Sequence, residues 1–230
     1  MLILQEEGQK NTLKRFKMED FEKKYISRIK KAEIIDSSAV KGCNIIRGYG
    51  FKLWEMIKNI IDKRLKENNY ENMYFPSFIP HSMLKKQDEH YKSFSREVVY
   101  CNKAGKEKIE EMAVRPTSET IIYPSIKKWI KTKEDLPLLI NQWCSVVRWE
   151  ILKPNFPLIR DNEFLWHECH SSHSDEEECD IYTEKIFSIY KELLQDYLAI
   201  PFFSGKKPER RNHLLRRTNT IANAPIIITR

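Results

Sequence analysis

Residues 136–152 read LPLLINQWCSVVRWEIL, a nearly continuous run of apolar, β-branched and aromatic side chains. Such a run is typical of a strand that is buried on both faces. The turn-like segment KPNFPLIR, residues 153–160, separates it from a second strand-like run, EFLWHECH, at residues 163–170. The two runs therefore predict a strand hairpin at the centre of the fold.

Helical patterns lie on both sides of this hairpin. Apolar residues at helical spacing predict amphipathic helices at residues 20–34, 51–69, 117–130 and from 174 to near 201. Ser174, with Glu177 three residues later, has the spacing of a capping box and is expected to open the last of them.

Two further segments have strand character. Residues 97–113 read as two strands joined by the turn NKAGK, and residues 74–79 are β-prone but interrupted by Pro76. Proline lacks the backbone N–H that a sheet requires, so the second segment is expected to lie at an edge or to leave the sheet there. Strands joined by hairpins predict an α+β fold, an antiparallel sheet with helices on one side.

Composition limits the class of protein. With 230 residues, 41% of them hydrophobic and 11% aromatic, the chain can bury a sizeable core, which excludes a wholly disordered protein. No apolar run approaches the roughly 20 residues that cross a bilayer. The five cysteines contain no CxxC pair and the N-terminus has no basic signal-peptide region, so we expect reduced thiols and a cytoplasmic protein without membrane contact.

Net charge distinguishes the C-terminal segment from the rest of the chain. Residues 206–230 contain seven basic residues and one acidic residue, so they carry six of the seven net positive charges. A basic tail can bind phosphate backbones or simply be a solvated end, and charge alone does not decide between them. We therefore expect an N-terminal extension at 1–19, a core at 20–205 and a divergent basic tail at 206–230.

Ionised side chains interrupt the apolar hairpin. Arg148 and Glu150 are two residues apart and therefore point to the same face of their strand. Burying an arginine costs several kcal/mol unless an anion meets it. That anion can be an internal carboxylate, such as Glu163 or Glu168 on the second strand, or the phosphate of a ligand, and both interpretations stay open at this point.

A cluster of metal-ligand residue types lies between His167 and Cys179. All its members are residue types that bind zinc: His167, Glu168, Cys169, His170, His173 and Cys179. On a strand, however, residues 167 and 170 point to opposite faces, which argues against one shared metal ion. A small metal-binding protein therefore remains an alternative, and we assign no metal ligand.

Three stretches together resemble one known family. Residues 42–80 are similar to the first motif of class II aminoacyl-tRNA synthetases, a long helix followed by a strand, with Pro76 at the dimer interface. AVRPTSETIIYP, residues 113–124, resembles the proline-pocket loop of the eukaryotic and archaeal type of prolyl-tRNA synthetase. Residues 141–170 resemble its second motif with the ATP-binding hairpin. The resemblance runs from about residue 21 to about residue 207.

The resemblance implies a proline-tRNA ligase, which activates proline with ATP and Mg²⁺ and transfers it to tRNA-Pro as a homodimer. Arg148 would be the catalytic residue, meeting the α-phosphate and the substrate carboxylate. The implied ATP-binding residues are Arg148, Glu150, Arg160, Asp161 and Phe164. The implied proline-binding residues are Thr117, Glu119, Arg148, Trp166, Glu168 and His170.

Departures from the family pattern predict weakened function. The family usually reads LRTREFLWQEGH where this chain reads IRDNEFLWHECH, so Asp161 adds a negative charge near the expected triphosphate and Cys169 fills space that a glycine leaves for substrate. The chain is also expected to be truncated before the third motif, with impaired or no activity. A non-catalytic paralogue that binds tRNA or a synthetase is the second alternative.

Overall fold

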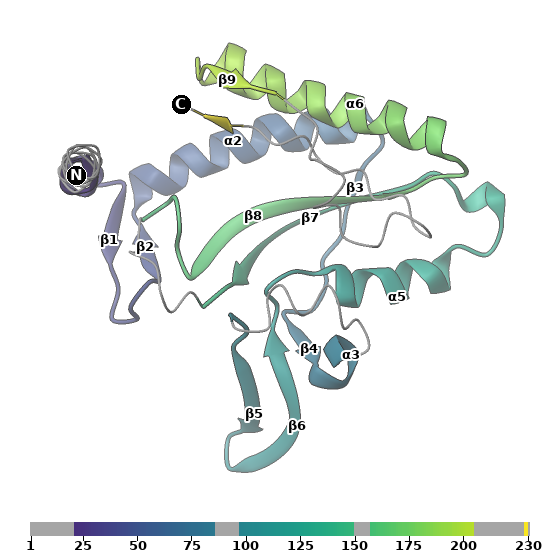
Figure 1. The fold of residues 1–230 in the computed structure, drawn as a ribbon, viewed down its shortest axis with the longest axis horizontal. Coiled ribbons are helices and arrows are strands. Elements are labelled where there is room, and N and C mark those ends of the chain that lie inside the picture. Colours follow the sequence, from purple (N-terminus) through teal and green to yellow (C-terminus); the bar gives the residue numbers. More distant parts are fainter. Residues whose placement is uncertain (1–20, 86–96, 150–156, 205–227, 230) are drawn as a thin grey trace, which may run out of the picture. The chain divides into compact units, whose positions relative to one another are not determined.

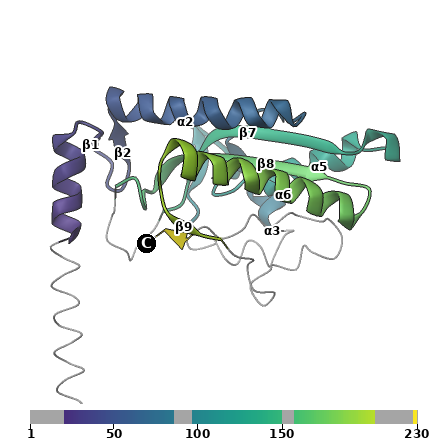
Figure 2. The same cartoon turned by 90° about the horizontal axis from the view of Figure 1, so that it is seen from above.

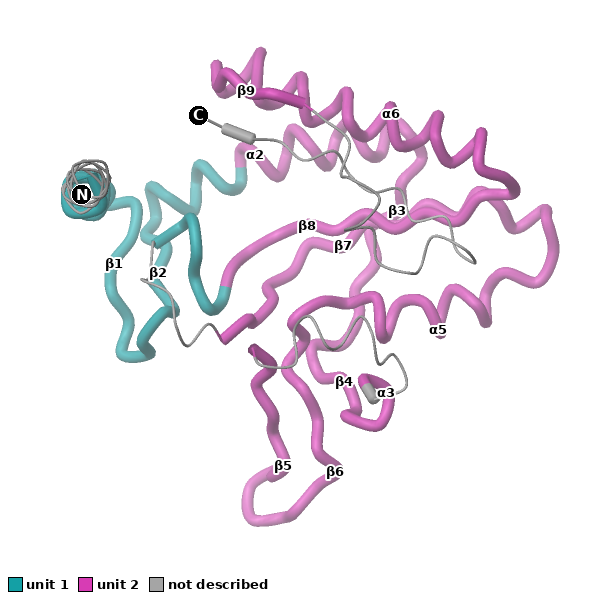
Figure 3. The backbone as a smooth tube through the Cα atoms, in the orientation of Figure 1, with its two compact units in different colours: residues 1–55, 152–163 teal, residues 56–151, 164–230 magenta. Residues whose placement is uncertain are grey.

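The computed structural model describes residues 21–85, 97–149, 157–204 and 228–229. The chain divides into two compact units, one of residues 1–55 with 152–163 and one of residues 56–151 with 164–230 (Figure 3). Each unit is described below by itself. The expected N-terminal extension and nearly all of the basic tail lie outside the described residues, and their boundaries stay predictions.

The first unit is built from a helix and a small hairpin. Residues 21–31 are helical, as the amphipathic pattern predicts, and β1 (Ile35–Ser37) pairs antiparallel with β2 (Asn44–Ile46). The first turns of α2 (Gly48–Glu67) follow directly. At Gly50 a side chain would collide with the carbonyl oxygen of Ile34, so the close approach of helix and strand requires glycine there.

The second unit contains the predicted central hairpin. β7 (Leu138–Val147) lies between β3 (Glu71–Asn72), with which it pairs in parallel, and β8 (Glu163–Ser172). Side-chain contacts pair Gln142 with Glu168 and Cys144 with Trp166, so the partner number rises on one strand as it falls on the other. The hairpin is therefore antiparallel, as predicted, and the parallel β3 strand was not predicted.

Helices cover both faces of this sheet rather than one. Leu139 packs in a core with residues of α2 and α6 (Glu176–Glu192), whereas Ile140 packs with α5 (Glu119–Trp129). Figure 1 shows α5 below β7 and β8, and Figure 2 shows α6 running beside α2. Adjacent residues of a strand point to opposite faces, so burial on both faces explains the unbroken apolar run.

A second, three-stranded sheet contains the other predicted hairpin. β5 (Tyr100–Ala104) pairs antiparallel with β6 (Glu107–Val114), and β6 also pairs with β4 (Phe78–Pro80). The strand order β4-β6-β5 puts the proline-bearing β4 at an edge, as predicted. The short helix α3 (His81–Lys85) follows β4, and its Leu84 packs against Ile79 and Ala113.

The residue that caps the start of α6 differs from the prediction. Asp175, not Ser174, caps α6, because its carboxylate accepts a hydrogen bond from the backbone N–H of Glu178 at 2.9 Å. Ser174 Oγ instead donates to Asp175 at 2.9 Å. The helix continues in a π-helical turn (Leu193–Tyr197), and β9 (Phe202–Phe203) pairs with β10 (Ile228–Thr229). A 3-10 turn, Lys133–Asp135, precedes β7.

Within the part of the chain that the structure describes, no helix is both long enough and apolar enough to cross a membrane.

Candidate active site

The even-numbered residues of β8 share the face of the sheet that is turned toward α5. Trp166 and Glu168 contact even-numbered residues of β7, and the His170 ring meets the ring of Tyr123 on α5 edge-on at 5.7 Å. The strand alternation therefore brings most of the predicted site residues of the second unit to one place.

Arg148 follows the last residue of β7 and is half-buried. Its Nε donates a hydrogen bond to the carbonyl oxygen of Pro116 at 2.8 Å. Its guanidinium carbon lies 5.7 Å from the ring centre of Phe164 and 5.3 Å from that of Trp166, and the two rings are nearly perpendicular. These cation–π contacts and the backbone bond hold the guanidinium in a fixed position.

Glu168 is a buried carboxylate at the centre of this face, with a side chain 8% exposed. Oε1 accepts a hydrogen bond from Gln142 Nε2 at 2.8 Å and lies 3.7 Å from Cys144 Sγ, and Oε2 lies 3.0 Å from His170 Nε2. Among the described residues, His170 is the one basic side chain within ion-pair distance of it. A carboxylate buried in this way favours a cationic ligand, because burial of charge is costly without compensation.

The start of α5 adds a second carboxylate, that of Glu119. Thr117 is buried, and its Oγ1 donates to Glu119 Oε2 at the first residue of α5. Burial raises the pKa of Tyr123 far above its ordinary value, and the negative charges of Glu119 and Glu168 raise it further. Both carboxylates therefore act on the same phenol, which remains protonated.

The indole of Trp166 is held by a hydrogen bond to the thiol of Cys144. The indole Nε1 donates to Cys144 Sγ at 3.1 Å. Burial raises the pKa of Cys144 to about 11, so this sulfur is a neutral thiol near pH 7. A fixed indole face next to a buried carboxylate suits a small ring that carries a positive charge.

Two buried residues of this region were not predicted. Arg115 is 3% exposed and donates from Nε to the carbonyl oxygen of Ser145 and from a terminal nitrogen to that of Phe75, both at 2.8 Å. Gln142 is 1% exposed. Arg115 begins the RPTSE segment, so its position was a usable signal, whereas the strand pattern does not indicate which groups Gln142 bonds to.

Three of the predicted ATP-binding residues are not among the described residues of the second unit. Arg160 is exposed and, with Asp161, belongs to the first unit, where Asp161 accepts hydrogen bonds from Asn44 Nδ2 at 2.6 Å and from the backbone N–H of Leu158 at 2.8 Å. Burial raises the pKa of Asp161 above its ordinary value. Glu150 lies outside the described residues, so these three assignments stay predictions.

The odd-numbered residues of β8 face the core beneath α6. His167 Nδ1 lies 3.0 Å from the Asn141 amide, and the His167 ring stacks on that of Tyr190, whose hydroxyl is bonded to the other ring nitrogen. Cys169 Sγ lies 3.3 Å from the same amide. The expectation that Cys169 fills substrate space was therefore wrong, because the side chain points away from Glu168 and His170.

This alternation also bears on the metal alternative. His167 contacts α6 while His170 contacts α5, so the two imidazoles lie on opposite faces of the strand. Within the described residues, no three side chains of the metal-binding types converge on one point. His173 is enclosed beside Tyr182, with Nδ1 3.5 Å from Glu178.

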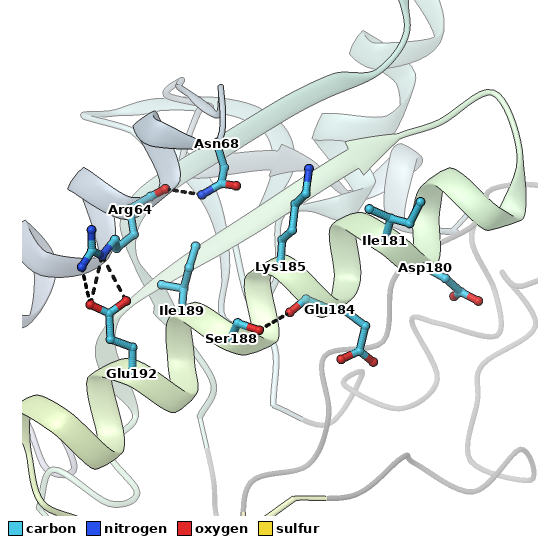
Figure 4. A pocket seen from close by; sticks show the side chains of 9 residues that line it. All are labelled: Arg64, Asn68, Asp180, Ile181, Glu184, Lys185, Ser188, Ile189 and Glu192. Carbon is cyan, nitrogen blue, oxygen red and sulfur yellow. Dashed lines mark hydrogen bonds and ion pairs between the residues drawn. The ribbon is translucent and has the colours of Figure 1, made fainter.

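Residues of α2 and α6 line a groove. It has a volume of about 720 Å³ and is lined by polar and charged residues with two isoleucines, listed here: Arg64, Asn68, Asp180, Ile181, Glu184, Lys185, Ser188, Ile189 and Glu192 (Figure 4). Arg64 bonds to Glu192 across it. None of the predicted site residues lines this groove, and the Arg64–Glu192 pair joins the two helices.

The burial of His167 predicts acid sensitivity. Burial lowers the pKa of His167 to about 4 from an ordinary value of 6.5, so the unfolded chain binds this proton more readily than the folded chain does. The contribution of His167 to the free energy of unfolding is therefore fully present above pH 6.5. It falls by about 3 kcal/mol as the pH drops toward 4. Urea unfolding of the natural chain and of His167→Gln at pH 7 and pH 4.5 measures this. The same loss in both would contradict the assignment.

The family of the chain is shown by comparison with known proteins. The family model described as tRNA synthetase class II core domain (G, H, P, S and T) matches residues 99–221, more than half of the chain. The chain belongs to this family. The class II resemblance and the α+β fold predicted from sequence are thereby confirmed.

Relatives narrow the branch of the family. The proline-tRNA ligase of Borreliella burgdorferi is 47% identical over 195 residues, and proline-tRNA ligase 2 of Bacillus cereus is 46% identical over 193 residues; each alignment covers 84% of this chain. The crystal structure of prolyl-tRNA synthetase from Cryptosporidium parvum, complexed with halofuginone and AMPPNP, superposes with a TM-score of 0.76 and 40% identity, covering 81% of this chain and 37% of that one. The chain spans about 40% of the length of the curated relatives.

Proposed function

We propose that the chain is the part of a proline-tRNA ligase that binds ATP and proline and forms prolyl adenylate, from which proline passes to tRNA-Pro. The observation that carries this proposal is the shared face of β7 and β8, where a fixed guanidinium, two aromatic rings and a buried carboxylate lie together. This set offers one group for each charged part of the two substrates.

The carboxylates would bind the ring ammonium of proline. Glu168 is buried, and its bonds to Gln142 and His170 fix the direction of both oxygens. Glu119 would approach the same ammonium from the α5 side, and the indole of Trp166 would pack on the pyrrolidine ring. The paired ammonium and ring contacts would favour proline over amino acids that lack the pyrrolidine ring.

Arg148 would act on the reacting atoms. An oxygen of the proline carboxylate attacks the α-phosphorus of ATP, a new phosphorus–oxygen bond forms, and the bond to the β-phosphate oxygen breaks to release pyrophosphate. Charge grows on the α-phosphate oxygens in this step, and a guanidinium already fixed by Pro116 and two rings stabilises it without reorganising. Phe164 would meet the adenine, and the ATP-binding role of Arg160 in the first unit stays a prediction.

Mg²⁺ would enter with ATP, held by the phosphates, because the Arg148 guanidinium suits phosphate and offers no oxygen ligand to a metal ion. When bound, Mg²⁺ neutralises charge on the phosphates that leave.

Binding of a stable adenylate analogue tests the proposal directly. Isothermal titration of the chain with prolyl-sulfamoyl-adenosine should show one site, with affinity at least about tenfold tighter than for the threonyl analogue. A chain that binds neither analogue would contradict the proposal and favour a non-catalytic relative.

We further propose a cytoplasmic homodimer that joins through the segment around Pro76. Pro76 is exposed, and the neighbouring Tyr74 and Phe78 are 72% and 49% exposed, with Phe78 on the edge strand β4. An exposed strand edge with aromatic side chains is stabilised by a partner. Light scattering should give twice the chain mass, and a monomer at micromolar concentration would contradict this.

A further inference from the structure

Gln142 is a buried amide that the proposed reaction does not use directly. It lies on β7, on the face that carries Glu168, and it is 1% exposed. Both polar atoms are engaged. Oε1 accepts a hydrogen bond from the backbone N–H of Phe75 at 2.6 Å, and Nε2 donates to Glu168 Oε1 at 2.8 Å and to Ser118 Oγ at 3.2 Å.

The surroundings fix the orientation of this amide. A backbone N–H can only donate, so the amide oxygen must face Phe75, and the NH₂ group must then face Glu168. Phe75 is itself anchored, because its carbonyl oxygen accepts a hydrogen bond from the buried Arg115 at 2.8 Å. Gln142 therefore presents its donors from a rigid support.

Glu168 is held at both oxygens as a result. Gln142 bonds to Oε1 and His170 contacts Oε2 at 3.0 Å. A glutamate side chain has several rotatable bonds, and its freedom must be removed before it can meet a ligand in one geometry. The second donor contact, to Ser118, connects the same amide to the start of α5, where Thr117 and Glu119 flank Ser118.

Resting on the function proposed above, we propose that Gln142 is a positioning residue for proline recognition. It orients the Glu168 carboxylate toward the ring ammonium of proline and ties that carboxylate, through Ser118, to the start of α5, which bears Glu119. A purely structural role would be limited to satisfying the Phe75 N–H and would not affect one ligand more than another.

A pair of ligands separates these two roles. Prolyl-sulfamoyl-adenosine carries the ring ammonium, and tetrahydrofuroyl-sulfamoyl-adenosine replaces it with an ether oxygen while keeping the ring. The ratio of their dissociation constants reports the ammonium–carboxylate interaction alone. A smaller folded fraction affects both ligands equally, so the ratio is insensitive to stability.

Gln142→Met removes the donors while nearly preserving side-chain volume. In isothermal titration the affinity ratio should fall about tenfold relative to the natural chain, as expected when a charge-assisted hydrogen bond is lost. Gln142→Asn, one carbon shorter, cannot reach Phe75 and Glu168 together and serves as a second variant. Asn141→Leu is the matched control, because Asn141 is an equally buried amide on the opposite face, and it should leave the ratio unchanged.

The outcomes separate this inference from the proposed function. If the natural chain binds the prolyl ligand and both Gln142 variants keep its ratio, the positioning role is overturned while the proposed function stands. If the natural chain binds neither ligand, the proposed function fails and this inference fails with it. A fall in the ratio for Asn141→Leu as well would reduce Gln142 to a general structural role.

Discussion

Replacing Arg148 by alanine should weaken binding of prolyl-sulfamoyl-adenosine by about 100-fold or more. The guanidinium is held between the Phe164 and Trp166 rings and bonded to the carbonyl oxygen of Pro116, so it is already in place to receive a negative group. Fixed donors at such positions are commonly worth a factor of about 10² to 10³ in an enzyme. Isothermal titration with the analogue measures the loss.

Two controls define what Arg148 contributes. Arg148→Lys keeps the charge but loses the planar fork and its stacking, so it should recover only part of the affinity. Arg28→Ala removes an exposed arginine and should leave binding unchanged. Equal affinity in Arg148→Ala and the natural chain would show that the guanidinium supports the fold and not the ligand.

Replacing Arg115 by alanine should lower the free energy of unfolding by about 3 kcal/mol. Arg115 is 3% exposed and donates to the carbonyl oxygens of Phe75 and Ser145, which lose these bonds in the variant. Each buried acceptor left without a partner costs about 1 to 3 kcal/mol. The stacking of the guanidinium on Tyr74, 5.6 Å away, is lost as well. Urea unfolding followed by tryptophan fluorescence measures the change.

An exposed arginine gives the comparison for Arg115. Arg47 forms an ion pair with Glu33 at 3.0 Å, with its side chain 42% exposed. Arg47→Ala should cost less than about 1 kcal/mol, because exposed ion pairs contribute little. Losses of the same size in the two variants would mean that the carbonyl bonds of Arg115 do not stabilise the fold.

The central hairpin could be predicted because its signals are local. The unbroken apolar run of β7 indicated burial on both faces, and the alternation of β8 indicated that Glu168 and His170 share a face while His167 points away. These properties follow from the two-residue period of side-chain direction in a strand, which is visible in the sequence. The helix start at Asp175 was missed because Ser174 has an equally good capping side chain, and only backbone geometry decides between them.

The supporting residues could not be predicted in the same way. Gln142 and Arg115 are polar residues whose burial depends on bonds to chain segments as distant as Phe75. Hydrophobic patterns do not record such partners, since the partner is chosen by the three-dimensional fold. Cys169 was misplaced for a related reason, because the family comparison concerned residue types and ignored the direction in which its strand position points.

The two faces of β8 leave this strand no tolerance for a change of length. A deletion or insertion of one residue within it would exchange the two faces of the strand. Glu168 and His170 would then point into the hydrophobic core beneath α6, and His167 and Cys169 would point to the face that carries Arg148. Such an indel would harm folding and ligand recognition together, whereas a point substitution can harm one alone. Length variation near this strand among natural forms of this protein should therefore fall in the segment that joins β7 to β8 and not within β8.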